Sequence, residues 1–125
     1  MAKGAYWQRG DAIDYVNSGG TKIDANTVIL YGSRLAIAGA DIPAGEKGAL
    51  LVEGVYELPK DYADSGKAIS AGDEVYWDNG NSCIKKAVAQ VVAEGAVTTE
   101  ASAVHGFAVA AAASADQTVL VKINA

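Results

Sequence analysis

The sequence predicts an all-β fold, either a small β-sandwich or a partly open β-barrel of short antiparallel strands. A turn phrase occurs twice, as Ile-Pro-Ala-Gly-Glu at residues 42–46 and as Ile-Ser-Ala-Gly-Asp at residues 69–73. Gly in each phrase can take the positive φ that a tight chain reversal needs, and a strand-like run follows. Turn signals rich in Gly, Asn and Ser recur about every ten residues, a spacing typical of sandwiches and barrels.

The first part of the chain predicts a hairpin and then one longer strand. Residues 28–31 and 35–37 are apolar runs that flank a Gly-Ser pair. Residues 49–58 follow the first turn phrase with apolar side chains at even positions, whereas Glu53 and Glu57 stand at odd positions. Such alternation indicates one strand with a buried face and a solvent face.

The second part of the chain predicts further strands. Residues 74–78 follow the second turn phrase, and Asn79-Gly80 is a strong signal for a two-residue type I′ hairpin turn. Apolar residues alternate again over 107–109 and 119–123. Because the strands after the two turn phrases differ in pattern, we interpret the phrases as one turn used twice rather than as an internal repeat.

Two assignments stay open between these strands. Val88, Val91 and Val92 lie at helical spacing within residues 85–94, which allows one short helix. Their β-branched side chains argue against it, because such residues lose χ1 freedom in a helix. Residues 95–102 are expected to form a loop.

Length and composition predict one domain with a thin core. The chain has 125 residues, half of them apolar but only 7% aromatic, so self-association could add buried surface. We expect an extended N-terminal arm at residues 1–10, which contains Lys3 and Arg9 but no acid, and a single β-rich domain at residues 11–125.

The charge and hydropathy pattern disfavours several classes of partner. The net charge is −5, and tight binding to nucleic acid needs clustered Lys and Arg. No run of apolar residues is long enough for a membrane span, and no apolar segment of a secretory signal stands near Met1. We therefore expect synthesis in the cytoplasm and no partnership with nucleic acid or membrane.

No catalytic constellation is apparent. His105 is the single histidine, and we expect it to be a packed strand residue. Cys83 is the single cysteine, so it forms no disulfide within the chain. The nearby Lys85 and Lys86 could lower its thiol pKa, although a small strand residue with no chemical role is the simpler interpretation. We predict neither catalytic residues nor a cofactor site.

Metal and nucleotide sites are also disfavoured. The acidic pairs do not fit the calcium-loop pattern, and we predict no metal site at Asp11/Asp14 or at Asp73/Glu74 with Asp78. Gly66-Lys67 matches the tail of a nucleotide-binding P-loop, but Ala68 stands where Ser or Thr would hold Mg²⁺. Asp61 stands where the first Gly of that pattern belongs.

Four segments in order carry a family likeness: Gly-Val-Tyr-Glu-Leu-Pro-Lys (54–60), Ala-Ile-Ser-Ala-Gly-Asp-Glu-Val-Tyr-Trp-Asp (68–78), Gly-Phe-Ala-Val-Ala-Ala-Ala (106–112) and Thr-Val-Leu-Val-Lys-Ile-Asn (118–124). In this order the chain resembles the small decoration (cement) proteins of tailed bacteriophage capsids. Members of that family sometimes carry a recombinase label, which the incomplete P-loop does not support. Residues 87–103 look longer than the family pattern and suggest a capping surface or a partner contact.

The resemblance implies a non-enzymatic homotrimer on the outer capsid surface of the virion. Its partner would be the major capsid protein, and it would clamp neighbouring capsomers against internal DNA pressure. The basic, aromatic arm supplies the candidate capsid contacts Lys3, Tyr6, Trp7 and Arg9. Two alternatives stay open, namely another head or tail component (a head-fibre base or a tail-tube-like part) and an uncharacterised enzyme that uses His105 or Cys83.

Overall fold

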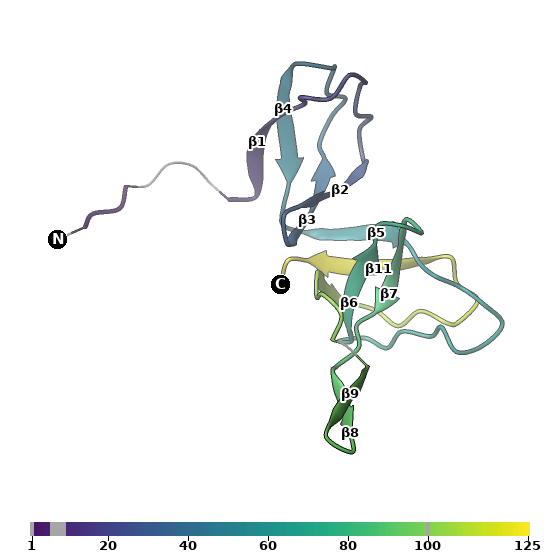
Figure 1. Cartoon of the computed structure of the whole chain (residues 1–125). Coiled ribbons are helices and arrows are strands. Elements are labelled where there is room, and N and C mark those ends of the chain that lie inside the picture. Colours follow the sequence, from purple (N-terminus) through teal and green to yellow (C-terminus); the bar gives the residue numbers. More distant parts are fainter. Residues whose placement is uncertain (1, 6–9, 100) are drawn as a thin grey trace.

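The fold is all-β, as predicted. A computed structural model describes residues 2–5, 10–99 and 101–125, with residues 91–93 and 97–99 described by their backbone alone. These residues form two antiparallel sheets of four and five strands and one separate two-stranded hairpin, with no helix among them. The two sheets lie one above the other, as in a sandwich, and the hairpin projects from the far end of the larger sheet (Figure 1).

The first sheet is built from residues 12–51. Its strands are β1 (Ala12–Val16), β2 (Val28–Tyr31), β3 (Arg34–Ala38) and β4 (Lys47–Leu51), in the spatial order β1-β4-β3-β2. The predicted hairpin at residues 28–37 is confirmed, with Tyr31 opposite Arg34 and a positive φ of 62° at Gly32.

The second sheet has the spatial order β5-β11-β10-β6-β7. Its strands are β5 (Val55–Pro59), β6 (Glu74–Asp78), β7 (Cys83–Lys86), β10 (Gly106–Ala108) and β11 (Thr118–Ile123). A single parallel bridge between Lys60 and Ile84 brings the edge strands β5 and β7 together, so the sheet curls strongly without closing into a barrel. The predicted strands at 74–78 and 119–123 are confirmed.

The prediction of one strand over residues 49–58 is wrong. Strand β4 ends at Leu51 and β5 begins at Val55, and the two belong to different sheets. Gly54 lies between them with a φ of 120°, a conformation that L side chains rarely adopt. The apolar alternation runs on through this break because both strands bury the same parity of residues, with Leu50 and Leu58 in different cores.

The hairpin between β6 and β7 is confirmed, but its predicted two-residue turn is wrong. Asp78 pairs with Cys83, so residues 79–82 form a four-residue loop. The Asp78 carboxylate accepts hydrogen bonds from the backbone N–H groups of Gly80 (3.1 Å) and Asn81 (3.3 Å). The positive φ falls at Ser82, so the aspartate side chain organises this loop.

The alternatives considered for residues 85–102 are both corrected. No helix forms, and the segment instead contains β8 (Val91–Ala93) and β9 (Ala96–Thr99), which pair with each other. Glu94 and Gly95 join them with φ values of 53° and 78°, as a type I′ turn requires. β-branched residues favour strands over helices, which explains the outcome.

Four tight turns share one hydrogen-bond pattern, at residues 24–27, 43–46, 70–73 and 113–116. In each turn the first carbonyl accepts a hydrogen bond from the amide three residues later, at 3.0–3.3 Å. The first three turns have a positive φ at Asn26, Gly45 and Gly72, as predicted for the two glycines. The residues before the turns pair by bridges, Ile23 with Ile42 and Ile69 with Ala112.

These turns belong to an internal repeat of topology. The first half, residues 11–53, has the order β1-β4-β3-β2, and the second half, residues 54–125, repeats it as β5-β11-β10-β6. The register agrees: Ala12 faces Leu51 as Val55 faces Lys122. The repeated phrase itself occupies non-equivalent turns, which precede β4 in the first half and β6 in the second. The two phrases are thus one turn used twice, as interpreted from the sequence, and they do not mark the repeat of topology that the structure reveals.

The two halves pack through one face of the first sheet. Leu35 and Ile37 of β3 join the larger core, which also holds Trp77, Ile84 and Val121 of the second half. A smaller core of Ala36, Ala38, Ile42 and Leu50 lies on the opposite face of the first sheet. Both faces of β3 are therefore buried.

Asn124 joins the halves near the C-terminus. Its side-chain amide donates hydrogen bonds to the carbonyls of Leu35 (2.6 Å) and Val52 (2.8 Å), and its side-chain oxygen accepts one from the Leu35 N–H (2.9 Å). These three hydrogen bonds tie the end of β11 to the backbone of the first half.

Candidate functional site

His105 is a structural residue. It is buried, its ring Nδ1 accepts a hydrogen bond from the backbone N–H of Trp77 at 2.8 Å, and its backbone N–H donates to the Val75 carbonyl. Burial lowers the pKa of its imidazole, so the ring is held neutral with its proton on Nε2. The expectation that His105 is packed is confirmed, but the residue lies just before β10 (Gly106–Ala108) and not within a strand.

Cys83 does not have the environment of a reactive thiol. The side chain is buried at the start of β7. Burial raises the pKa of its thiol and the charge of Asp61 raises it further, against a weaker opposing effect of Lys85. Lys85 thus lowers the thiol pKa as suggested, but burial and Asp61 outweigh it and the net shift is upward.

The acidic residues near β6 support turns and ion pairs. Asp73 accepts a hydrogen bond from the Ser70 N–H at 2.9 Å. A hydrogen bond from Lys85, with a second from Asn81, lowers the pKa of Asp78 to about 2. In the part of the chain that the structure describes, no three His, Cys, Asp or Glu side chains gather where a metal ion could be held.

Lys60 carries a buried ammonium group that the sequence did not reveal. Its side chain is 2% exposed, and Nζ donates to the carbonyls of Asp61 (2.8 Å), Ser114 (3.1 Å) and Asp116 (3.2 Å). All three N–H donors of the ammonium group are thus paired with carbonyl oxygens, and two of these carbonyls belong to the fourth turn, residues 113–116. Asn17 has the equivalent place in the first half, with its amide bound to the Thr21 and Ile42 carbonyls.

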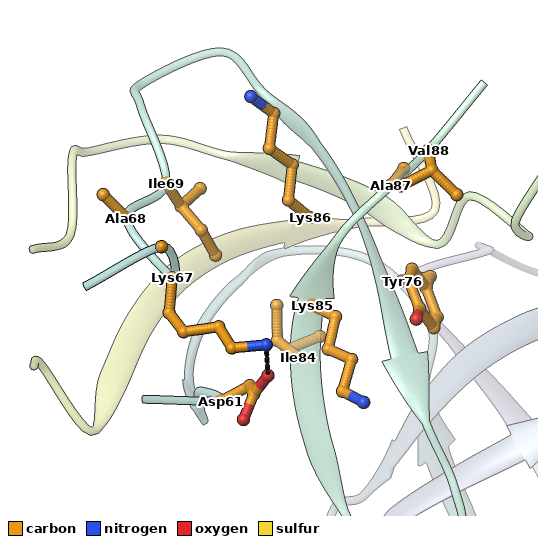
Figure 2. Close-up of a pocket in the computed structure, with 11 residues that line it drawn as sticks. Asp61, Lys67, Ala68, Ile69, Tyr76, Ile84, Lys85, Lys86, Ala87 and Val88 are labelled. Atoms are coloured by element: carbon orange, nitrogen blue, oxygen red, sulfur yellow. Dashed lines mark ion pairs between the residues drawn. The ribbon is translucent and has the colours of Figure 1, made fainter. Parts of the chain in front are cut away.

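A hollow with a volume of about 480 Å³ lies beside the edge strand β7. Figure 2 shows Lys67 reaching across it to Asp61, at 3.0 Å. Lys85 pairs with Asp78 at 2.8 Å, and Lys86 pairs with Asp73 at 3.5 Å. Each lysine of the hollow already faces a carboxylate, so the hollow does not present free positive charge to a ligand. Lys67, the lysine of the partial P-loop match, is thus paired with Asp61.

The predicted contact residues of the arm are only partly described. Lys3 lies in the exposed segment of residues 2–5, which forms no strand and extends away from the sheets (Figure 1). Tyr6, Trp7 and Arg9 lie outside the described residues. The other aromatic pair is placed: Trp77 is in the larger core, and Tyr76 is half-buried beside the hollow.

The features together define a class of protein. Buried polar groups hold backbone, the thiol and imidazole are withdrawn from solvent, and the described residues contain no helix long and apolar enough to cross a membrane. These features describe a small all-β protein whose buried polar side chains support the fold.

The family comparison agrees and is more specific. A family model described as phage cement protein matches residues 7–123, and the chain belongs to that family. Members are structural capsid-associated proteins rather than enzymes, which places this chain at the capsid of a virion. Comparison with curated proteins and with solved structures gives no significant match.

Proposed function

We propose that this chain binds the outer surface of an assembled phage capsid as a homotrimer and stabilises the shell by clamping neighbouring capsomers of the major capsid protein. The observation that supports the proposal most strongly is the family match over residues 7–123, which covers nearly the whole chain. The acidic net charge of −5 suits a position outside the shell, away from the packaged genome.

The N-terminal arm, residues 1–10, is the proposed capsid contact. Lys3 and Arg9 give it positive charge without any acid, and Tyr6 and Trp7 are residue types that anchor protein interfaces. The remaining residues, 11–125, form the decoration domain in this proposal. A segment that becomes ordered on binding loses conformational entropy. In this proposal, the aromatic and the charged contacts together offset that loss.

The test uses phage heads that lack this protein and adds back purified chain. Binding is measured by co-sedimentation, and electron microscopy locates the added density. The intact chain is expected to bind the outside of the shell, and removal of residues 1–9 is expected to reduce binding strongly. A truncated chain that bound as well as the intact one would reject the role of the arm. Density at a tail or fibre site would favour the alternative structural roles.

A further inference from the structure

The outer face of the second half carries exposed apolar side chains. Val119, Val121 and Ile123 of β11 point into the larger core, which leaves Leu120 and Lys122 on the other face of the strand. Strand β11 lies between β5 and β10, so its outward residues occupy the middle of a three-stranded surface.

The strand register brings the apolar residues of this surface together. Lys122 lies between Val55 on β5 and Phe107 on β10. Leu120 lies opposite Glu57, and its carbonyl accepts a hydrogen bond from Val109. Val55, Leu120 and Val109 are 52%, 41% and 38% exposed. We call these six residues the outer face: Val55, Glu57, Phe107, Val109, Leu120 and Lys122.

The internal repeat shows what this face does in the other half. By register, Ile37 and Leu51 of the first half correspond to Phe107 and Lys122 of the second. Ile37 is 3% exposed, and both first-half residues pack against the larger core, which lies mainly in the second half. The same face of the repeat is therefore covered by protein in the first half and open to solvent in the second.

The charged residues of the outer face indicate what kind of partner covers it. Glu57 and Lys122 are exposed, and neither forms an ion pair with another described residue. Five other lysines do form ion pairs: Lys22, Lys47, Lys67, Lys85 and Lys86. One acid and one base therefore stand near the centre of the outer face, so a second copy can offer each of them an opposite charge.

We infer that the outer face is a self-association surface, where Glu57 of one copy pairs with Lys122 of the next around Leu120 and Val55. A stable interface buries about 800 Å² per partner, more than these side chains supply, so they form its centre inside a wider polar rim. The inference rests on the proposed trimer for its biological setting, but it concerns contacts between copies alone and is tested without capsids.

The experiment measures mass against concentration by light scattering and sedimentation for five proteins. These are the intact chain, Glu57→Lys, Lys122→Glu, the double variant with both changes, and a control, Glu46→Lys. The control makes the same change of charge as Glu57→Lys, but at an exposed turn of the first half. Each single variant places like charges together and is expected to weaken association about tenfold or more. The control and the double variant are expected to associate like the intact chain.

A mixture of the two single variants provides the decisive test. The Glu57→Lys chain has two bases on its outer face, and the Lys122→Glu chain has two acids, so a mixture is expected to associate more strongly than either variant alone. In a closed ring of three, one like-charged contact remains, and the recovery is partial. Circular dichroism and thermal unfolding confirm that every variant is folded.

Three results would overturn the inference: an intact chain that stays monomeric at all concentrations, single variants that associate normally, or a mixture with no gain in mass. If the face instead contacts the capsid, the single variants lose head binding while their self-association is unchanged. If association follows the prediction but the intact chain does not bind heads, the proposed function fails and the self-association surface stands.

Discussion

The two halves of the molecule share one topology but differ in what their outer faces meet. In the first half, β3 is buried on both sides, because one face packs on its own small core and the other on the second half. In the second half, the equivalent strand β10 has Phe107 on an open face. The comparison teaches that the chain itself covers this face of the repeat in the first half, whereas the equivalent face of the second half stays exposed.

The insertions also fall in the second half. Where the first half joins β2 to β3 by a two-residue connection, the second half inserts β7, β8 and β9 between β6 and β10. The β8–β9 hairpin pairs with no other strand and projects from the body (Figure 1). Since an isolated two-stranded hairpin is marginally stable in water, we propose that this segment is a partner contact.

Replacing the buried lysine should give the largest loss of stability. Lys60→Met removes three hydrogen bonds and leaves the carbonyls of Asp61, Ser114 and Asp116 without that donor. We expect a loss of about 3–4 kcal/mol in the free energy of unfolding, measured by chemical denaturation. Lys22→Met is the matched control and should change the free energy of unfolding much less, because Lys22 makes only exposed ion pairs. Equal effects would remove the distinction between the two lysines.

Removing the side chain that joins the halves should come next. Asn124→Ala deletes the hydrogen bonds to Leu35 and Val52 and places Ala at a φ of 58°. The expected loss is about 2–3 kcal/mol by denaturant unfolding. Asn124→Gly separates the causes, since it loses the same bonds but tolerates the φ. A wild-type stability for Asn124→Ala would show that the halves do not depend on this residue.

The turn glycines offer a smaller effect that tests the repeated turn. Gly45→Ala and Gly72→Ala meet no atom within 4 Å but must hold φ values of 79° and 88°. We expect each to lose about 1–2 kcal/mol, because L residues resist this region. Ala115, at the corresponding place in the fourth turn, has no positive φ, so Ala115→Gly should lose about 0.5–1 kcal/mol through chain entropy. A stabilising Ala115→Gly would contradict this account of the fourth turn.

A pH dependence specific to the second half should follow from His105. Burial lowers its pKa in the folded state below the unfolded value of 6.5, so the unfolded chain binds the proton more tightly. Stability from this group is full above about pH 6.5 and falls as pH drops through the folded-state pKa. Leu35 stands at the equivalent position in the first half and does not titrate. Denaturation of His105→Gln between pH 7.5 and 5 should show a weaker slope than the intact chain, and an identical slope would reject the assignment.

Local sequence signals predicted the positions of the strands better than the assignment of the strands to sheets. Alternation located β11 because inward Val and Ile side chains recur at every second residue, and the Gly-Ser pair located the first hairpin. Alternation could not reveal the change of sheet at Gly54, because the buried parity is the same on both sides. The equivalent turns at residues 24–27 and 113–116 were missed since Asn26 and Ala115 replace the glycine.

The sequence excluded chemistry more readily than it located surfaces. A lone His and a lone Cys predicted structural roles, and both are buried. The burial of Lys60 depends on carbonyls more than fifty residues away, which no local pattern records. Leu120 was visible as an outward residue of an alternating strand, but its neighbours Val55, on β5, and Val109, just after β10, are brought together only by the fold.

Titration of capsids with the purified chain tests the central claim most directly. Heads that lack the chain are mixed with increasing amounts of it, and the bound fraction and the temperature of head rupture are measured together. We expect saturable binding in a fixed ratio to capsomers and a rise in the rupture temperature as sites fill. Absence of binding, or saturation without any change in rupture temperature, would contradict the role of this chain as a stabilising cement protein.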